Sequence, residues 1–319
     1  MYRIGVDLGG TNIAVGLVNE NYEIEIKKST PTLAQRSSEE ISADICALCI
    51  AVCKEKGIDI KDVANIGVAA PGIANTLKGT VEYSCNLPFR KFKIAEFIAN
   101  TLGVDKSRVT VANDANAAAW GEAVAGAAKG TTDSIMVTLG TGVGGGVIIN
   151  GKIFTGFNFA GAEIGHIVIE LDGAQCGCGR RGCWEAYSSA TGLIRMTKEK
   201  IAECEAEGRY TSMSRAERIS GRTACDAMRH GDAAGKEVYD KYVKYLATGL
   251  TNMINIFQPQ VISLGGGVSN EGQSLIDALI PLVRAEQYGA AFLDKSELTE
   301  IRIAKLGNDA GIIGAAALA

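Results

Sequence analysis

The sequence has no cluster of lysine and arginine residues, and its formal net charge is −4 at pH 7. A protein whose main partner is nucleic acid or an anionic membrane normally presents concentrated positive charge. The longest uncharged interior stretch, around residues 135–151, is interrupted by glycines at positions 140, 142, 144, 145, 146 and 151. Such a stretch does not form the continuous apolar helix that crosses a membrane. We therefore expect neither a nucleic acid nor a membrane as partner.

A leader segment is not expected either, because a strand-like run, Ile4–Leu8, begins almost directly after Met1. The nine cysteines are an odd number for a chain of 319 residues. Together these features favour a reducing, cytoplasmic compartment in which thiols are buried or bound to metal. Hydrophobic residues make up 47% of the chain, and its length is enough for two domains that each bury a core.

The hydrophobic pattern predicts strands alternating with helices. Strands are expected at residues 4–8, 13–17, 22–26, 65–69 and 109–111, with a helix that begins at a Ser37–Glu40 capping box and ends at Gly57. A second group of strands starts at Ser134. A long helix follows Gly235 and stops at Pro259, and strands 261–264 and 301–304 precede a short helix from Gly311. This order predicts an α/β protein with mixed sheets.

A short pattern occurs twice. Residues 7–11, Asp-Leu-Gly-Gly-Thr, and residues 138–142, Thr-Leu-Gly-Thr-Gly, are each followed by an apolar strand. Two strand–turn–strand units 131 residues apart suggest a duplicated fold that holds a ligand between its halves. Chance similarity between short glycine-rich strings is the alternative.

Glycine turns of this kind can hold phosphate because backbone N–H groups approach the anion without interference from a Cβ. Gly140, Gly142 and Gly145 also match G-x-G-x-x-G, but an apolar strand follows them where the dinucleotide fingerprint requires a helix. Asp7 lies beside the first turn. An aspartate at the end of a strand often serves only the turn; the functional alternative is a carboxylate that holds Mg²⁺ next to phosphate.

Cysteine spacing provides the most specific chemical signal. Cys176, Cys178 and Cys183 lie close together, and His166 precedes them by ten residues. Three thiolates and one imidazole complete a tetrahedral zinc shell, and a shell made only of protein ligands is structural. Three buried free thiols are the alternative. For Cys46, Cys49 and Cys53 core packing is the better interpretation, and no metal geometry is evident for the other three, Cys85, Cys204 and Cys225.

Asn113 and Asp114 lie where a strand gives way to an alanine-rich helix. A residue of either type at this position is usually an N-cap. Their functional interpretation rests on the other motifs of the chain. These are two glycine loops, the cysteine cluster, and the acidic residues Glu163 and Glu185 on either side of that cluster. Carboxylates and an amide suit a polyhydroxylated ligand, and a kinase needs one aspartate as general base.

These motifs resemble the ROK family (repressors, open reading frames and kinases) of the hexokinase and actin-like ATPase superfamily, over essentially the whole chain. Residues 7–12 resemble its first phosphate motif, residues 139–146 its second, and residues 264–268 its adenosine-side loop. Residues 161–166 and 176–185 resemble its zinc and sugar signature. The resemblance implies a two-domain actin-like ATPase (ribonuclease H-like) fold with an interdomain cleft. The smaller domain is expected at residues 1–112 plus 305–319, and the larger at 113–304.

The resemblance also implies an ATP-dependent hexokinase that phosphorylates the 6-hydroxyl of a hexose, with glucose preferred, in carbohydrate metabolism such as glycolysis. It implies ATP, Mg²⁺ and structural Zn²⁺ as cofactors and a homodimer as the assembly. Asp114 is implied to be the catalytic base. The remaining roles are implied as follows: sugar contacts from Asn113, Asp114, Glu163, His166 and Glu185; zinc ligation by His166, Cys176, Cys178 and Cys183; and nucleotide or phosphate contacts from Asp7, Gly9, Gly10, Thr11, Asn12, Thr138, Gly140, Thr141, Gly142, Gly265, Gly266 and Gly267.

Two kinds of alternative remain. Kinases for N-acetylmannosamine, N-acetylglucosamine, fructose or allose share the same motifs, although residues 183–187, Cys-Trp-Glu-Ala-Tyr, resemble the glucokinase version most. A sugar-responsive ROK repressor is expected to carry an N-terminal DNA-binding domain, whereas here the first phosphate strand begins at residue 3. Asn86-Leu87-Pro88-Phe89 also resembles the loop that ROK glucokinases place near the sugar.

Overall fold

The structure is a computed structural model that describes residues 1–318. The chain divides into two compact units, which we call the N-terminal unit and the central unit. The N-terminal unit comprises Met1–Met136, Gly146–Ala162 and Ala304–Ala319, and the central unit comprises Val137–Gly145 and Glu163–Ile303.

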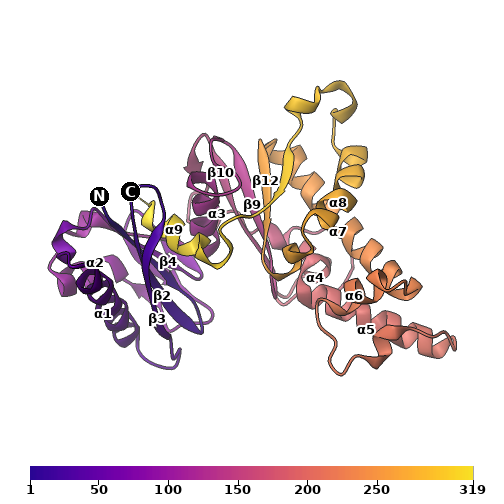
Figure 1. Cartoon of the computed structure of the whole chain (residues 1–319), viewed down its shortest axis with the longest axis horizontal. Coiled ribbons are helices and arrows are strands. Elements are labelled where there is room, and N and C mark those ends of the chain that lie inside the picture. Colours follow the sequence, from indigo (N-terminus) through magenta and orange to yellow (C-terminus); the bar gives the residue numbers. More distant parts are fainter. Residues whose placement is uncertain (319) are drawn as a thin grey trace. The chain divides into compact units, whose positions relative to one another are not determined.

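A five-stranded mixed sheet of order β3-β2-β1-β4-β8 forms the base of the N-terminal unit (Figure 1). Strand β1 pairs antiparallel with β2 and parallel with β4, and β4 pairs parallel with β8. Because β1, β4 and β8 are parallel, their carboxyl ends meet at the same edge of the sheet, and the candidate site residues Asp7 and Asn113 lie there. The strands are β1 (Arg3–Leu8), β2 (Asn12–Val18), β3 (Ile24–Pro31), β4 (Ile66–Ala70) and β8 (Val109–Asn113).

Helices α1 (Ser38–Lys56) and α2 (Ile94–Leu102) cover one face of this sheet, and α9 (Ala310–Ala316) covers the other (Figure 1). Successive residues of β4 divide between the faces: Val68 belongs to the core cluster that includes α1 and α2, whereas Ala69 packs with a residue of α9. Helix α1 begins at the predicted capping box and ends at Gly57 in the left-handed conformation (φ 77°). The predicted bounds of this helix are confirmed.

Two strand glycines allow α9 to lie directly on the sheet. A Cβ placed on Gly5 would lie 1.9 Å from the carbonyl oxygen of Ile312, and one on Gly67 would lie 1.7 Å from that of Ala315. Neither position has room for any side chain. The last helix is therefore part of the core that the first strands form.

A second five-stranded sheet has the order β11-β10-β9-β12-β13. Counted along the chain, both sheets follow the same pattern: third, second, first, fourth, fifth. The predicted duplication of a strand–turn–strand unit is thereby confirmed at the level of topology. The strands are β9 (Ser134–Leu139), β10 (Val143–Ile149), β11 (Lys152–Ile153), β12 (Val261–Gly265) and β13 (Glu300–Ile303).

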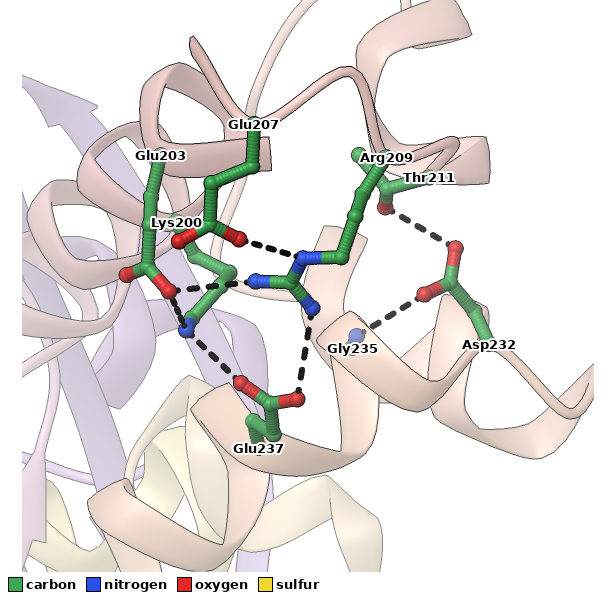
Figure 2. A network of polar contacts seen from close by, with 8 residues as sticks. All are labelled: Lys200, Glu203, Glu207, Arg209, Thr211, Asp232, Gly235 and Glu237. Carbon is green, nitrogen blue, oxygen red and sulfur yellow. Dashed lines mark hydrogen bonds and ion pairs between the residues drawn. The ribbon is translucent and has the colours of Figure 1, made fainter. Parts of the chain in front are cut away.

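Helices predominate in the central unit: α4 (Trp184–Ser188), α5 (Ala190–Ala206), α6 (Thr223–Arg229), α7 (Ala233–Phe257) and α8 (Gln273–Glu286). The predicted long helix is α7, and Asp232 is its N-cap. Figure 2 shows Asp232 accepting hydrogen bonds from the Thr211 hydroxyl and the Gly235 amide, beside ion pairs that join α5 to α7 through Lys200 and Glu237. Burial opposes the shift, but hydrogen bonds from the hydroxyl and amide of Ser212, the Gly235 amide and the Thr211 hydroxyl lower the pKa of Asp232 to about 2.

Some local structure departs from the sequence prediction. Tyr22 is not the start of a strand; it lies in a turn at φ 64°, and β3 starts at Ile24. The alternation of apolar residues continues through this turn, so periodicity could not reveal it. A small antiparallel sheet of β5 (Ile73–Asn75), β6 (Thr80–Tyr83) and β7 (Arg90–Phe92) was not predicted, because its strands are too short to show a period.

The α/β class with mixed sheets is confirmed. The domain boundaries at residues 112/113 and 304/305 stay a prediction; the compact units group residues 113–136 with the N-terminal residues. That grouping reflects close packing of α3 (Asp114–Val124) against α9, where a Cβ on Gly314 would lie 1.7 Å from the carbonyl oxygen of Ala117. Among the described helices, none combines the length and apolarity that a membrane span requires.

Candidate active site

The first glycine turn joins β1 to β2 and is fixed from outside. Within the turn, the Gly9 amide donates to the Asn12 carbonyl at 3.0 Å. Buried Thr32 holds both sides of it: its hydroxyl donates to the Gly9 carbonyl at 2.6 Å, and its amide donates to the Thr11 carbonyl at 2.8 Å. Gly10, Thr11 and Asn12 remain exposed. The turn is therefore rigid and accessible, as a phosphate site requires.

Asp7 lies at the end of β1 next to this turn, and its carboxylate faces α9. The carboxylate atoms lie 3.2 to 3.5 Å from where a Cβ on Gly311 would be. Burial and the negative charge of Asp114 raise the pKa of Asp7 to about 6, while Lys27 lowers it. Lys27 itself pairs with Asp309 at 2.5 Å. A carboxylate whose ionisation is disfavoured by a neighbouring carboxylate suits a site that receives a divalent cation, since oxygen ligands of this type hold Mg²⁺.

Asn113 and Asp114 have different roles at the start of α3. Asn113 is the N-cap: its side-chain oxygen accepts from the Asn116 amide at 3.1 Å, and its side-chain nitrogen donates to the Gly72 carbonyl at 3.0 Å. Asp114 is the first helical residue, and one carboxylate oxygen accepts from the Ala115 amide at 2.8 Å. The capping function thus belongs to Asn113, which leaves the Asp114 carboxylate available for chemistry.

The environment of Asp114 has two opposing effects on its pKa, because a helix N-terminus favours the ionised form and burial disfavours it. Its side chain reaches solvent, but the surrounding protein still desolvates the carboxylate and raises its pKa. The hydrogen bond from the Ala115 amide acts in the opposite direction and is the smaller effect. Desolvation outweighs the helix terminus, and a carboxylate with a raised pKa is a stronger base than a free one.

The second glycine turn lies between β9 and β10 in the central unit. The Gly140 amide donates to the Gly142 carbonyl at 3.0 Å, which closes a tight turn next to Thr138 on β9. The third glycine run, Gly265–Gly267, ends β12 beside it. Gly266 has φ 86°, and a Cβ there would lie 2.6 Å from the carbonyl carbon of Leu139. Two of the predicted nucleotide loops are therefore adjacent, and glycine is what permits this approach.

The predicted zinc ligands come together. The ligand atoms of His166, Cys176, Cys178 and Cys183 all lie within 4.8 Å of one another. His166 Nδ1 is 3.8 Å from Cys176 Sγ, and Cys178 Sγ is 3.7 Å from Cys183 Sγ. Ligands bound tetrahedrally at about 2.3 Å are about 3.8 Å apart. The four side chains fit a zinc ion, and since Nδ1 faces the cluster, Nε2 is the nitrogen left for another partner.

The other predicted sugar ligands of the central unit are Glu163 and Glu185, which lie close in sequence to residues of this cluster. Glu163 is exposed and precedes the short helical turn Ile164–His166. Glu185 follows Cys183 and Trp184 on α4; one of its oxygens accepts from the Val143 amide at 3.0 Å, and the other lies 3.4 Å from Cys176 Sγ. The structure thus groups Glu163, His166 and Glu185 in the central unit, and Asn113 with Asp114 in the N-terminal unit.

Comparison with known proteins identifies the family. Residues 3–319 match the ROK family. The chain belongs to the ROK family. It is similar to the glucokinase of Thermotoga maritima, with 34% identity over 99% of this chain and 96% of the relative. It is also 26% identical to a xylose repressor of Caldicellulosiruptor bescii, over 99% of this chain and 77% of the repressor.

Among solved structures, this ROK protein is similar to a ROK family glucokinase from Streptomyces griseus in complex with glucose and AMPPNP. The TM-score is 0.77 and the identity 34%, over 100% of this chain and 99% of that one. The resemblance predicted from the motifs is confirmed, and so is the actin-like ATPase fold. The roles assigned to individual residues stay predictions.

Several residues that support the ROK site were missed by sequence reasoning. Thr32 fixes the first turn from 23 positions away, Lys27 and Asp309 form an ion pair across 282 positions, and Thr191 contacts the second turn across 50. No local motif marks such partners, because their role follows only from the folded chain. Cys46, Cys49 and Cys53 are buried on α1, which agrees with the predicted core packing, and Cys85 is exposed.

Proposed function

We propose that this ROK protein phosphorylates the 6-hydroxyl of glucose with ATP as donor. The enzyme is an ATP-dependent hexokinase, in keeping with its family and with the glucokinases that resemble it. The observation that carries the assignment is the division of labour at the start of α3, where Asn113 caps the helix and Asp114 does not. A carboxylate that is not the N-cap of the helix and whose pKa is raised is equipped to accept the hydroxyl proton.

In this reaction Asp114 accepts the proton of the sugar 6-hydroxyl while the oxygen of that hydroxyl forms a bond to the γ-phosphorus of ATP. The bond from that phosphorus to the bridging oxygen breaks, and ADP leaves. Asn113, Glu163, His166 and Glu185 bind the hexose, and the three glycine loops bind the nucleotide. Mg²⁺, held near Asp7, would neutralise phosphate charge, and Zn²⁺ would fix the segment that carries His166 and Glu185.

An assay coupled to ADP formation, run across a panel of sugars, tests the substrate assignment. Glucose should have the highest kcat/KM among glucose, fructose, allose, N-acetylmannosamine and N-acetylglucosamine. An N-acetylhexosamine that is preferred tenfold or more would assign this site to a different sugar. The cytoplasmic location, the homodimer and the place in glycolysis belong to this proposal and stay predictions.

The Asp114→Asn variant tests the base. It preserves size and leaves the Asn113 cap in place, so the fold should be retained while kcat falls by about 10² or more, with little change in sugar affinity. Asp62→Asn, at an exposed aspartate of the same unit, is the matched control and should be unaffected. Normal turnover in a folded Asp114→Asn protein would remove Asp114 from catalysis and make Glu163 the next candidate.

A further inference from the structure

Three hydrogen bonds join the segment from α4 to the start of α5 to the second glycine turn. The Glu185 carboxylate accepts from the Val143 amide at 3.0 Å. The Ala190 amide donates to the Gly140 carbonyl at 2.8 Å, and the Thr191 hydroxyl donates to the Thr141 carbonyl, also at 2.8 Å. All of these residues belong to the central unit. Residues 185–191 therefore bind both ends and the middle of the turn.

The two carbonyl contacts determine where the neighbouring amides point. In a planar trans peptide, the C=O of one residue and the N–H of the next point in opposite directions. With the carbonyls of Gly140 and Thr141 held by α5, the amides of Thr141 and Gly142 face away from α5. Within the described chain neither amide has a hydrogen-bond partner. Two successive free N–H groups in a glycine turn form a site for an anion.

The side of the turn next to Glu185 has no spare room. A Cβ on Gly142 would lie 2.3 Å from a carboxylate oxygen of Glu185. The carboxylate therefore rests directly on the backbone of the turn, and any side chain at position 142 would displace it. Glu185 bonds to the peptide group between Gly142 and Val143, and the Thr191 hydroxyl bonds to the adjacent one, between Thr141 and Gly142.

The segment that holds the turn, residues 184–191, packs against α7 and is hydrogen-bonded to it. The indole of Trp184 is fully buried and packs directly on Gly249 of α7. A Cβ on Gly249 would lie 1.9 Å from Cε2 of the indole. The Tyr242 hydroxyl donates to the Ser188 carbonyl at 2.8 Å. The N-cap of α4 is Cys183, one of the predicted zinc ligands. The turn is thus held by a segment that is fixed at several points.

We infer that Thr191 is a positioning residue for nucleotide phosphate: with Glu185, it holds the second glycine turn so that the Thr141 and Gly142 amides face the anion. This inference rests on the proposed function. Thr191 has an exposed side chain at the start of a helix and no role in the core. Its hydroxyl matters because it fixes the orientation of a peptide group that would otherwise be free to rotate.

The Thr191→Val variant tests the inference, since valine keeps the shape and removes the donor. We expect KM for ATP and Kd for AMPPNP, measured by calorimetry, to rise about three- to tenfold, the usual effect of one hydrogen bond. KM for the hexose should change less than twofold. Thr191→Ser retains the hydroxyl and should restore nucleotide affinity. Thr248→Val is the matched control, because its hydroxyl bonds only to its own helix, at the Lys244 carbonyl.

Unchanged nucleotide affinity in Thr191→Val, an equal loss of hexose affinity, or failure of serine to restore binding would each overturn the inference. The melting temperature of each variant shows whether the fold is intact. If the valine variant does not fold, Thr191→Ala removes the same donor with a residue that favours helix, and the same outcomes apply. A wild-type protein that binds no adenine nucleotide would overturn the proposed function itself, which is a different result.

Discussion

At the scale of single residues, Asp7 is arranged at a cost to the stability of the protein at neutral pH, because burial and Asp114 disfavour its ionised form. Its carboxylate is buried near Asp114, and its pKa is about 6 instead of the ordinary 3.8. The Asp7 carboxyl group therefore stays protonated to a higher pH in the folded protein than in the unfolded chain. The resulting stabilisation is complete below pH 4 and is lost as the pH rises through about 6.

Asparagine at position 7 does not ionise, so the Asp7→Asn protein should not lose stability as the pH rises through about 6. Asp7→Asn should be about as stable as the wild type near pH 4 and more stable at pH 7.5, by about 2 kcal/mol. It should also lose most Mg²⁺-dependent turnover while retaining hexose affinity, since Asp7 is predicted to act at the phosphate and not at the sugar. Thermal unfolding at both pH values, with Asp62→Asn as control, measures the first effect and calorimetry with hexose the second. A variant that is less stable at pH 7.5 would contradict the electrostatic account.

At the scale of elements, the cysteine-rich segment should depend on its ion. The purified protein is expected to contain about one zinc per chain, because His166 and three cysteines complete a tetrahedral shell. Cys178→Ala removes one ligand and should lower the zinc content well below that, with a lower melting temperature. Cys85→Ala changes an exposed thiol outside the cluster and should keep its zinc. Wild-type protein with no bound metal after purification without chelators would contradict the prediction.

Sequence reasoning succeeded for elements whose signal is local. The capping box before α1, the long apolar repeat of α7 and the ligand spacing of the cysteine cluster each lie within a short stretch of chain. It failed where tertiary contacts decide. The pKa of Asp114 depends on burial that no local pattern reveals, and the hydrogen bonds of Glu185 and Thr191 reach residues 42 and 50 positions away.

At the scale of the whole molecule, residues from both ends of the chain complete one core. Strands β1 and β4 hold glycines where α9 lies on the sheet. Gly67→Ala would place a methyl group 1.7 Å from the Ala315 carbonyl oxygen, so the helix must move or detach. We expect a loss of more than about 2 kcal/mol of unfolding free energy, measured by urea denaturation.

Gly221→Ala provides the control, because the nearest atom to its added methyl would be 3.4 Å away, an ordinary contact. It should be close to neutral. If Gly67→Ala were equally neutral, the contact between α9 and β4 would not be part of the folded core.

The position of α9 also determines when the first sheet can be completed during translation. Strand β4 ends at Ala70 and α9 starts at Ala310, so residues 71–309 must be synthesised before the helix can cover the sheet. At roughly 5 to 20 residues per second, this delay is about 10 to 50 s. During that interval the face of the sheet that packs on α9 lacks this helix and has only partial cover, for instance where Ala117 of α3 packs on Ala69 of β4. The first sheet to emerge is thus among the last parts to be completed.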